Sequence, residues 1–219
     1  KSPNIILDDA DIDYSIAGST VGIGVNHGQC CNAGSRLFVQ EKVFDRVVGG
    51  IAANAEKIKL GAGMDPETEM GPMVSSIQHG RVCGYLKSGK EEGARAVTGG
   101  SGVEGPGYFV KPTVLVDTRP DMKVVREEIF GPVVVAIPFK EADDALIAEA
   151  NNTIYGLAAT IWTNDIKRAH RTAAAIRAGN VSINFPTVNP PDAPFGGYKQ
   201  SGTGRELSRH ALDLYKQVK

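Results

Sequence analysis

The chain alternates between two patterns of hydrophobic and polar positions. Short apolar runs bounded by polar or turn residues predict buried strands. Such runs lie at 4–7, 37–39, 133–137, 158–162 and 181–183. Apolar residues that recur three and four positions apart predict amphipathic helices. These segments lie at 11–24, 42–59, 75–92, 142–152, 165–178 and 205–216. Because strands and helices alternate, the pattern predicts a three-layer α/β/α fold with a largely parallel sheet.

Glycine and proline mark the expected breaks between these elements. Two segments rich in these residues predict loops, at 61–72 and 99–107. Pro112 interrupts a β-rich segment at 108–116, so we expect an edge or bent strand there. Gly179 is expected to end the helix at 165–178. No repeat or linker divides the chain, so we expect one domain over residues 1–219.

The composition is ordinary for a globular protein, with 42% hydrophobic residues, 22% charged residues and a net charge of −1. Basic and acidic residues are interspersed, so neither a nucleic-acid surface nor a membrane-binding helix is expected. The three cysteines favour free thiols in a reducing compartment, the cytoplasm or the mitochondrial matrix. The four histidines are scattered and no Cys-x-x-Cys occurs, so no metal site is expected.

One segment combines adjacent cysteines with small residues, Gly28-Gln29-Cys30-Cys31-Asn32-Ala33-Gly34-Ser35-Arg36. Glycine lets a backbone approach a reacting group, and N–H groups beside a thiol can stabilise a developing oxyanion. A thiol with a modestly lowered pKa is a good nucleophile. Taken alone, the pattern also fits an inert buried cysteine. Cys83 lies in a helical pattern and is expected to be a packing thiol of that kind.

A glycine pattern just before this segment, at 22–28, is similar to a dinucleotide-binding loop. We reject that interpretation because the spacing is not G-x-G-x-x-G and because the pattern follows a predicted helix, where a strand is required. Its small residues are expected to permit close helix packing instead.

Three further segments stand out along the chain. They are Glu69-Met70-Gly71-Pro72-Met73-Val74, Glu127-Glu128-Ile129-Phe130-Gly131-Pro132-Val133, and Pro194-Phe195-Gly196-Gly197-Tyr198-Lys199 with Ser201-Gly202 and Gly204-Arg205-Glu206. Together with residues 28–36, and in the same order, they resemble motifs of the NAD(P)-dependent aldehyde dehydrogenases. The resemblance covers essentially all 219 residues. It implies the catalytic domain of an enzyme that oxidises an aldehyde to a carboxylic acid with NAD or NADP.

The resemblance also implies roles for individual residues. Cys31 is implied as the nucleophile, which forms a thiohemiacetal with the aldehyde and, after hydride transfer, a thioester that water hydrolyses. Its backbone N–H is implied to form half of an oxyanion hole. The Glu128 carboxylate is implied to bind the hydroxyls of the nicotinamide ribose, with Phe130 packed near the nicotinamide. Gln78 and Arg81 are implied to contact the adenosine end of the cofactor. Cys30, Phe185 and Phe195 are implied to contact the aldehyde.

Parts of such an enzyme are implied to lie outside this chain. In the family, a Glu-Leu-Gly-Gly segment with the general-base glutamate directly precedes a segment like Lys1-Ser2-Pro3-Asn4. We therefore expect the base, the cofactor-binding domain and the oxyanion asparagine upstream, and a last oligomerisation strand downstream. The chain alone is then expected to be a weak dehydrogenase, and the parent enzyme a homodimer or homotetramer. Two alternatives stay open: a relative that passes the thioester to coenzyme A, and a non-enzymatic homologous fragment.

Overall fold

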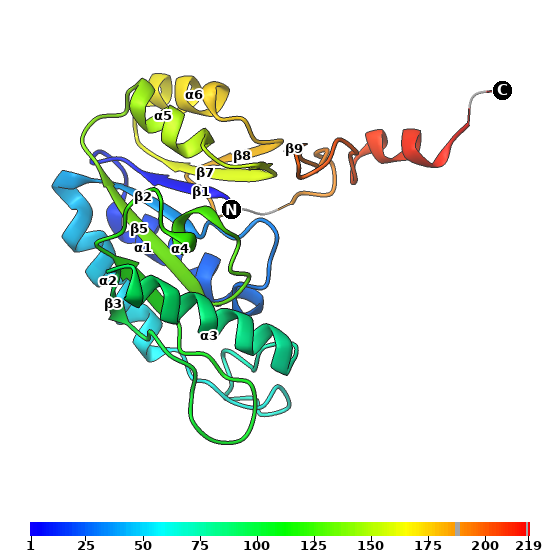
Figure 1. Cartoon of the computed structure of the whole chain (residues 1–219). Helices are drawn as coiled ribbons and strands as arrows, with labels where there is room; N and C mark the ends of the chain where they lie inside the picture. The colour runs from blue at the N-terminus through cyan, green and yellow to red at the C-terminus, as the bar shows by residue number, and fades with distance from the viewer. Residues whose placement is uncertain (187–188, 218) are drawn as a thin grey trace.

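The apolar runs form the strands of a seven-stranded sheet (Figure 1). The computed structural model describes residues 1–186, 189–217 and 219. The strands are β1 (Pro3–Ile6), β2 (Arg36–Gln40), β3 (Arg95–Thr98), β4 (Thr113–Val116), β5 (Val133–Phe139), β7 (Ala158–Trp162) and β8 (Asn180–Ile183). Their order across the sheet is β3-β4-β5-β2-β1-β7-β8, and only the β3–β4 pair is antiparallel. The predicted largely parallel sheet is therefore confirmed. Two short strands, β6 (Tyr155–Gly156) and β9 (Tyr198–Lys199), pair separately.

The amphipathic segments form the main helices. These are α1 (Ile12–Gly24), α2 (Phe44–Lys57), α3 (Ser76–Glu91), α4 (Lys123–Arg126), α5 (Asp144–Asn151) and α6 (Ile166–Ala175), with 3-10 segments η1 (Val25–Gly28), η2 (Glu41–Val43) and η3 (Arg209–Tyr215). Polar side chains cap four of the helices. Asp11, Ser75, Asp143 and Asp165 each accept a hydrogen bond from a backbone N–H in the first turn of α1, α3, α5 and α6.

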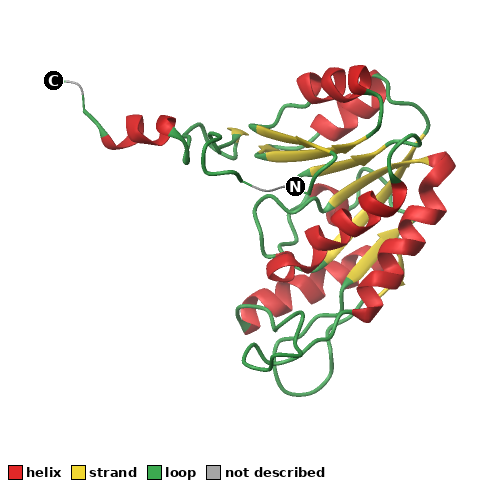
Figure 2. Cartoon of the chain, turned by 180° about the vertical axis from the view of Figure 1, so that it is seen from behind, coloured by secondary structure: helices red, strands yellow, loops and turns green. Residues whose placement is uncertain are grey.

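Helices cover both faces of the sheet because alternate strand residues point to opposite sides. In β5, Val134 and Ala136 pack with α1 and α2, whereas Val133 and Val135 pack with α3 and α4. Helices α5 and α6 cover β1, β2 and β7 on the second face through a third apolar cluster, which includes Ile5. Figure 2 shows the helices on either side of the sheet. The three-layer arrangement agrees with the prediction.

The strand within 108–116 is not at the edge of the sheet, so the first of the two predicted alternatives, an edge strand, is wrong. β4 is an inner strand, because β3 pairs with it on the side away from β5. Pro112 precedes the first residue of β4, so the missing N–H removes no hydrogen bond from the ladder. β3 and α4 have four residues each, which is too short for a periodic pattern to predict them.

The prediction of a helix over 205–216 is wrong. Only residues 209–215 are helical, and they form the 3-10 segment η3. Three apolar side chains of η3 are more than half exposed, those of Leu212, Leu214 and Tyr215. Most helical stability in proteins comes from packing an apolar face, and these side chains remain largely exposed to solvent. The tail therefore extends away from the sheet (Figures 1 and 2).

Two glycines have roles other than those expected. α6 ends at Ala175, so Gly179 does not terminate it. Gly179 lies instead where a Cβ would overlap the carbonyl oxygen of Gly196, which only glycine avoids. Gly22 does not permit close helix packing, because the nearest atom to its Cβ position is the backbone nitrogen of Gly34, 3.8 Å away.

The strand order brings three distant segments together. β5, β2 and β1 are parallel neighbours, so the segments that precede them meet at the amino-end edge of the sheet. These segments are residues 127–132 before β5, 28–35 before β2, and 1–2 before β1. The cysteine pair and Glu128 thus lie in adjacent segments of the fold, although about a hundred residues separate them in the sequence.

Candidate active site

We call residues 28–35 the nucleophile loop and residues 127–132 the Glu128 segment. The chain enters the nucleophile loop through an unusual backbone conformation. Asn26, His27 and Gly28 have φ values of 51°, 60° and 65°, in the left-handed region. At Gly28 a Cβ would overlap the carbonyl oxygen of Gly131. Glycine is therefore required where the nucleophile loop contacts the Glu128 segment.

Side chains of the nucleophile loop connect it to the motif at 69–74 and to the segment that precedes the Pro194–Glu206 motif. The Gln29 Oε1 atom accepts a hydrogen bond from the backbone N–H of Val74, with an N–O distance of 3.1 Å. The Asn32 amide nitrogen lies 3.5 Å from the side-chain oxygen of Asn189, which precedes the Pro194–Glu206 motif. Together with the contact of Gly28 and Gly131, these hydrogen bonds bring three of the four motifs to one region, and the loop also reaches the segment that leads into the fourth.

The two cysteines of the nucleophile loop have different surroundings. Cys31 is exposed, whereas Cys30 is half-buried and donates from Sγ to Oδ1 of Asn32 at 2.9 Å. Neither cysteine forms a disulfide. Partial burial raises the pKa of the Cys31 thiol above its ordinary value, and the nearby Cys30 and Glu128 add to this shift. Backbone N–H groups of Cys31 and Asn32 lower the same pKa, which indicates that both N–H groups face the sulfur.

The Glu128 segment is held by two side chains of α3. Gln78 donates from Nε2 to the carbonyl oxygens of Ile129 and Phe130, at 3.1 and 2.7 Å. Arg81 donates to the carbonyl oxygen of Glu128 at 2.8 Å. Phe130 has a φ of 57°, which a bulky residue rarely adopts, and these hydrogen bonds support that conformation. Gln78 and Arg81 thus position the Glu128 segment; their contact with an adenosine stays a prediction.

The Glu128 segment contains the two residues that the resemblance assigns to the nicotinamide end of NAD(P), Glu128 and Phe130. Within the part of the chain that the structure describes, no hydrogen bond to the Glu128 carboxylate is present, and the residue is half-buried. Its two oxygens can therefore accept hydrogen bonds from the two hydroxyls of a ribose. The half-buried ring of Phe130 follows two residues later. The contacts of Glu128 and Phe130 with NAD(P) stay predictions.

Lys1 places a buried cation at the same edge of the sheet. The side-chain ammonium (Nζ) of Lys1 is buried and has no hydrogen-bond partner among the described residues. Burial lowers the pKa of this ammonium to about 7; nearby Arg36 adds to the shift and Glu128 opposes it. Arg36 is also buried, but its guanidinium donates to three carbonyl oxygens, those of Lys1, Glu149 and Ala150. The buried guanidinium of Arg36 therefore has hydrogen-bond partners, whereas the buried side-chain ammonium of Lys1 has none among the described residues.

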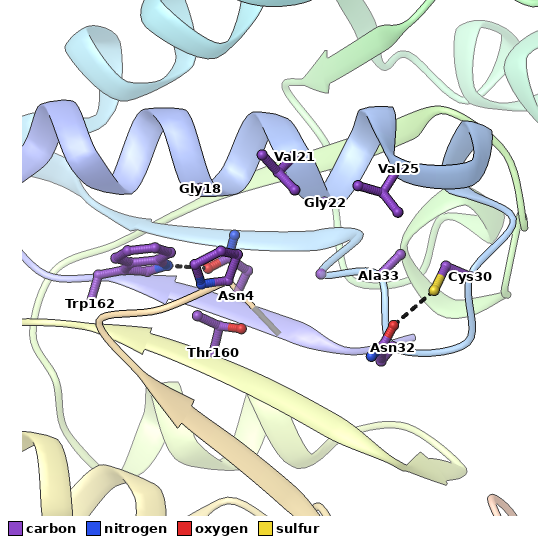
Figure 3. A pocket seen from close by; sticks show the side chains of 12 residues that line it. Asn4, Gly18, Val21, Gly22, Val25, Cys30, Asn32, Ala33, Thr160 and Trp162 are labelled. Carbon is purple, nitrogen blue, oxygen red and sulfur yellow. Dashed lines mark hydrogen bonds between the residues drawn. The ribbon is translucent and has the colours of Figure 1, made fainter. Parts of the chain in front are cut away.

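A cavity of about 170 Å³ begins at the nucleophile loop (Figure 3). Cys30 and Asn32 line one end, and α1 supplies a wall that includes Val21 and Gly22, continued by Val25 of η1. The opposite end reaches Trp162 at the end of β7. Of the residues that the resemblance assigns to the aldehyde, Cys30 lines this cavity.

The two predicted aromatic contacts lie elsewhere. Phe185 is about half exposed, and its neighbour Pro186 lines the cavity in its place. Phe195 exchanges two backbone hydrogen bonds with Glu206 within the tail. Neither ring is among the lining residues of the cavity, so their contact with a substrate stays a prediction.

The sequence patterns did not predict site roles for Gln29, Asn32, Lys1 or the α1 wall of the cavity. Gln29 and Asn32 flank the cysteine pair, and amide side chains beside a candidate nucleophile could have been recognised as groups that orient the loop. The position of Lys1 and the cavity depend on strand order and helix packing, which a local pattern does not contain.

None of the described helices is both long enough and apolar enough to cross a membrane. No group of three or more His, Cys, Asp and Glu side chains is arranged to hold a metal ion within residues 1–186, 189–217 and 219.

Known proteins are similar to this chain in sequence and in fold. The model of the aldehyde dehydrogenase family matches residues 1–219. An aldehyde dehydrogenase of Emericella nidulans is 48% identical over 219 residues, which are all of this chain and 44% of that protein. The NAD+ complex of the Bacillus cereus aldehyde dehydrogenase has 53% identity and a TM-score of 0.97, and the match covers 100% of this chain and 44% of that one. This chain spans less than half the length of these relatives, and it belongs to the aldehyde dehydrogenase family.

Proposed function

We propose that a protein containing this chain is an NAD(P)+-dependent aldehyde dehydrogenase and that Cys31 is its nucleophile. One observation carries the proposal: Gly28 contacts Gly131, so the nucleophile loop packs against the Glu128 segment. This contact brings an exposed thiol near a half-buried carboxylate that suits a ribose diol. Holding a nucleophile close to a bound reactant accounts for much of enzymatic rate enhancement. The NAD+ bound by the Bacillus cereus relative supports the cofactor class.

The chemistry of Cys31 follows from its surroundings. The thiolate attacks the aldehyde carbon, a C–S bond forms, and the carbonyl oxygen becomes an oxyanion that a backbone N–H of the loop can stabilise. Bound NAD(P)+ supplies the acceptor for the hydride that leaves this carbon. Cys31 then carries a thioester, which water cleaves to the carboxylic acid and the free thiol.

The raised pKa of Cys31 limits this reaction in the chain on its own. A thiol with a pKa above its ordinary value has little thiolate at neutral pH. The relatives are more than twice as long as this chain. We therefore propose that groups outside these 219 residues, the cofactor among them, complete the activation of Cys31.

Acylation by p-nitrophenyl acetate tests the assignment of Cys31 without requiring the cofactor. The thiolate attacks the ester carbonyl, the C–S bond forms, and p-nitrophenolate leaves with the electrons of the broken C–O bond. We expect peptide mass spectrometry to find the acetyl group on Cys31. Because the pKa of this thiol is raised, the acylation rate should go on rising at pH values where an ordinary thiol is already ionised.

Matched cysteine variants complete this test. We expect Cys31→Ser to lose acylation by about 100-fold or more, since a hydroxyl is a far weaker nucleophile at its free pKa. Cys83→Ser should react like the unchanged chain, because Cys83 lies on α3 beside His79 and outside the nucleophile loop. An acetyl group on Cys30 or Cys83 in place of Cys31 would overturn the proposal.

A further inference from the structure

We infer that the cavity beside the nucleophile loop holds the hydrocarbon part of the substrate, so that this site takes uncharged aldehydes of roughly six carbons. We infer further that Gly22 sets the depth of the cavity. This inference rests on the proposed function of Cys31, and it adds a substrate class and a residue that determines it.

The position of the cavity suits a group attached to Cys31. Cys30 and Asn32 line its near end, and they are the two chain neighbours of Cys31. Figure 3 shows both side chains at that end, with Trp162 at the other. Cys31 is not itself a lining residue, but both of its chain neighbours are, so we infer that an acyl group on its sulfur can extend into the near end of the cavity.

The volume of the cavity limits the size of the acyl group that it can hold. It measures about 170 Å³. An apolar protein cavity of about 150 Å³ is known to bind benzene, a ring of six carbons. A chain or ring of roughly that size therefore fits, whereas a two-carbon aldehyde leaves most of the space unfilled.

The walls of the cavity favour an uncharged group. None of the described residues that line it has an ionisable carboxylate, ammonium or guanidinium. The Asn4 amide is engaged on both atoms, since it accepts from Trp162 Nε1 at 2.7 Å and donates to Ser19 at 2.8 Å. Cys30 likewise donates to Asn32. A charged substrate group would lose its hydration here without an opposite charge in the wall, which is costly.

The glycines of α1 explain why the space exists. At Gly18 a Cβ would overlap the Trp162 ring, so the helix lies against that ring. At Gly22, one turn later, the nearest atom to a Cβ is 3.8 Å away, which is ordinary contact. The wall at Gly22 is therefore open, and a larger side chain there can enter the cavity without moving the backbone.

Acylation by esters of increasing length tests this inference on the chain as it is. The rate with p-nitrophenyl hexanoate is divided by the rate with the acetate, and the same ratio is measured for N-acetylcysteine in solution. Burying one methylene is worth roughly fourfold in binding. We expect the ratio for Cys31 to exceed that of the free thiol by about tenfold or more.

Variants at Gly22 test whether the higher hexanoate-to-acetate ratio comes from the cavity. Gly22→Leu fills the cavity and is expected to bring the ratio down to that of the free thiol, with Gly22→Ala in between. Gly84→Leu is the matched control, because Gly84 is an exposed glycine in α3 with no atom within 4 Å of its Cβ position. Its ratio should equal that of the unchanged chain. If Gly22→Leu does not fold, as judged by circular dichroism, Gly22→Ala decides the question.

The outcomes separate this inference from the proposed function. A hexanoate-to-acetate ratio equal to that of the free thiol, or one that neither Gly22 variant changes, overturns the inference while acylation of Cys31 still supports the function. A cationic p-nitrophenyl ester that reacts with Cys31 as fast as the hexanoate overturns the uncharged substrate class. No acylation of Cys31 by any ester overturns the proposed function itself.

Discussion

The nucleophile loop and the Pro194–Glu206 motif of the tail are both rich in glycine, but the molecule holds them in different ways. The loop is fixed by close contacts with distant parts of the chain, at Gly28 against Gly131 and at Gln29 with Val74. The tail motif is held partly by bonds within itself, where Arg205 donates to the carbonyl oxygens of three residues between 197 and 204. Its ties to the body are hydrogen bonds, such as the β6–β9 pairing, and the close backbone contact of Gly196 with Gly179, and none of its residues belongs to the buried hydrophobic core.

This difference has a consequence for mutations. A change in the nucleophile loop disturbs the packing of neighbouring strands, so its effect should reach the whole fold. A change in the tail should stay local, because few apolar contacts of the tail depend on the sheet. The four predictions below test this contrast, starting with the largest expected effect.

Gly28→Ala should destabilise the chain by about 3 kcal/mol or more. Alanine pays about 1–2 kcal/mol for the left-handed conformation, and its Cβ would also overlap the Gly131 carbonyl. Chemical denaturation would measure the free energy of unfolding. The control, Gly84→Ala on the open face of α3, should be neutral or stabilising by up to about 1 kcal/mol. Equal stability of the two variants would mean that the loop contact is not specific.

Lys1→Met should stabilise the chain at pH 6 by on the order of a few kcal/mol, because it removes a buried cation without a partner. The folded pKa of about 7 lies below the ordinary 10.5, so the unfolded chain binds more protons between these values. The stability of the unchanged chain should therefore rise as pH increases from 7 to about 10.5.

The pH dependence separates Lys1 from other lysines. The α-amino group of residue 1, whose pKa burial lowers from 8.0 to about 5, adds a rise below pH 8 in every variant. Denaturation curves from pH 8 to about 10.5 should therefore show that Lys1→Met loses the rise in stability, while Lys111→Met, which alters an exposed side chain, keeps it. A Lys1→Met variant that is less stable than the unchanged chain at pH 6 would contradict the buried and unpaired state of this ammonium.

Lys199→Met should loosen the tail motif without unfolding the body. The Lys199 ammonium donates to the carbonyl oxygens of Asn151 and Thr153, at 2.9 and 3.2 Å. Losing these bonds should cost about 1–2 kcal/mol locally. Amide hydrogen exchange of Phe195 and Glu206, which bond to each other, should then rise about tenfold.

The control for this tether is Lys216→Met, an exposed lysine of the same tail, which should leave exchange unchanged. A fall in whole-chain stability as large as that of Gly28→Ala would show that the tail motif is coupled to the sheet, and the contrast between the two regions would then be wrong.

Gln29→Ala should have the smallest effect, about 1 kcal/mol. It removes the hydrogen bond to the backbone of Val74, whose exposed N–H can bond to water instead, and a longer contact of 3.3 Å between Gln29 Nε2 and His27 Nδ1. Thermal unfolding would measure the change in stability. A loss above about 2 kcal/mol would mean that this bond, and not the contact of Gly28, fixes the nucleophile loop.

The sequence predicts the parts of this protein that depend on neighbouring residues. Apolar runs predict the inner parallel strands, such as Val133–Phe139, because a strand buried on both faces needs apolar residues throughout. Asp11 predicts the start of α1 because a cap acts within one turn. The same reasoning fails at 205–216, where an apolar pattern is present but no surface packs against it.

The motifs in the sequence also determine the family and point to Cys31 and Glu128 as site residues. Only the tertiary structure brings these two residues into adjacent segments, through the parallel order β5-β2-β1. The same order buries Lys1, and the packing of α1 on the sheet leaves the cavity beside Gly22. Hydrophobic period and capping are properties of consecutive residues, whereas strand order, close backbone contact and cavity shape arise between residues far apart in the chain.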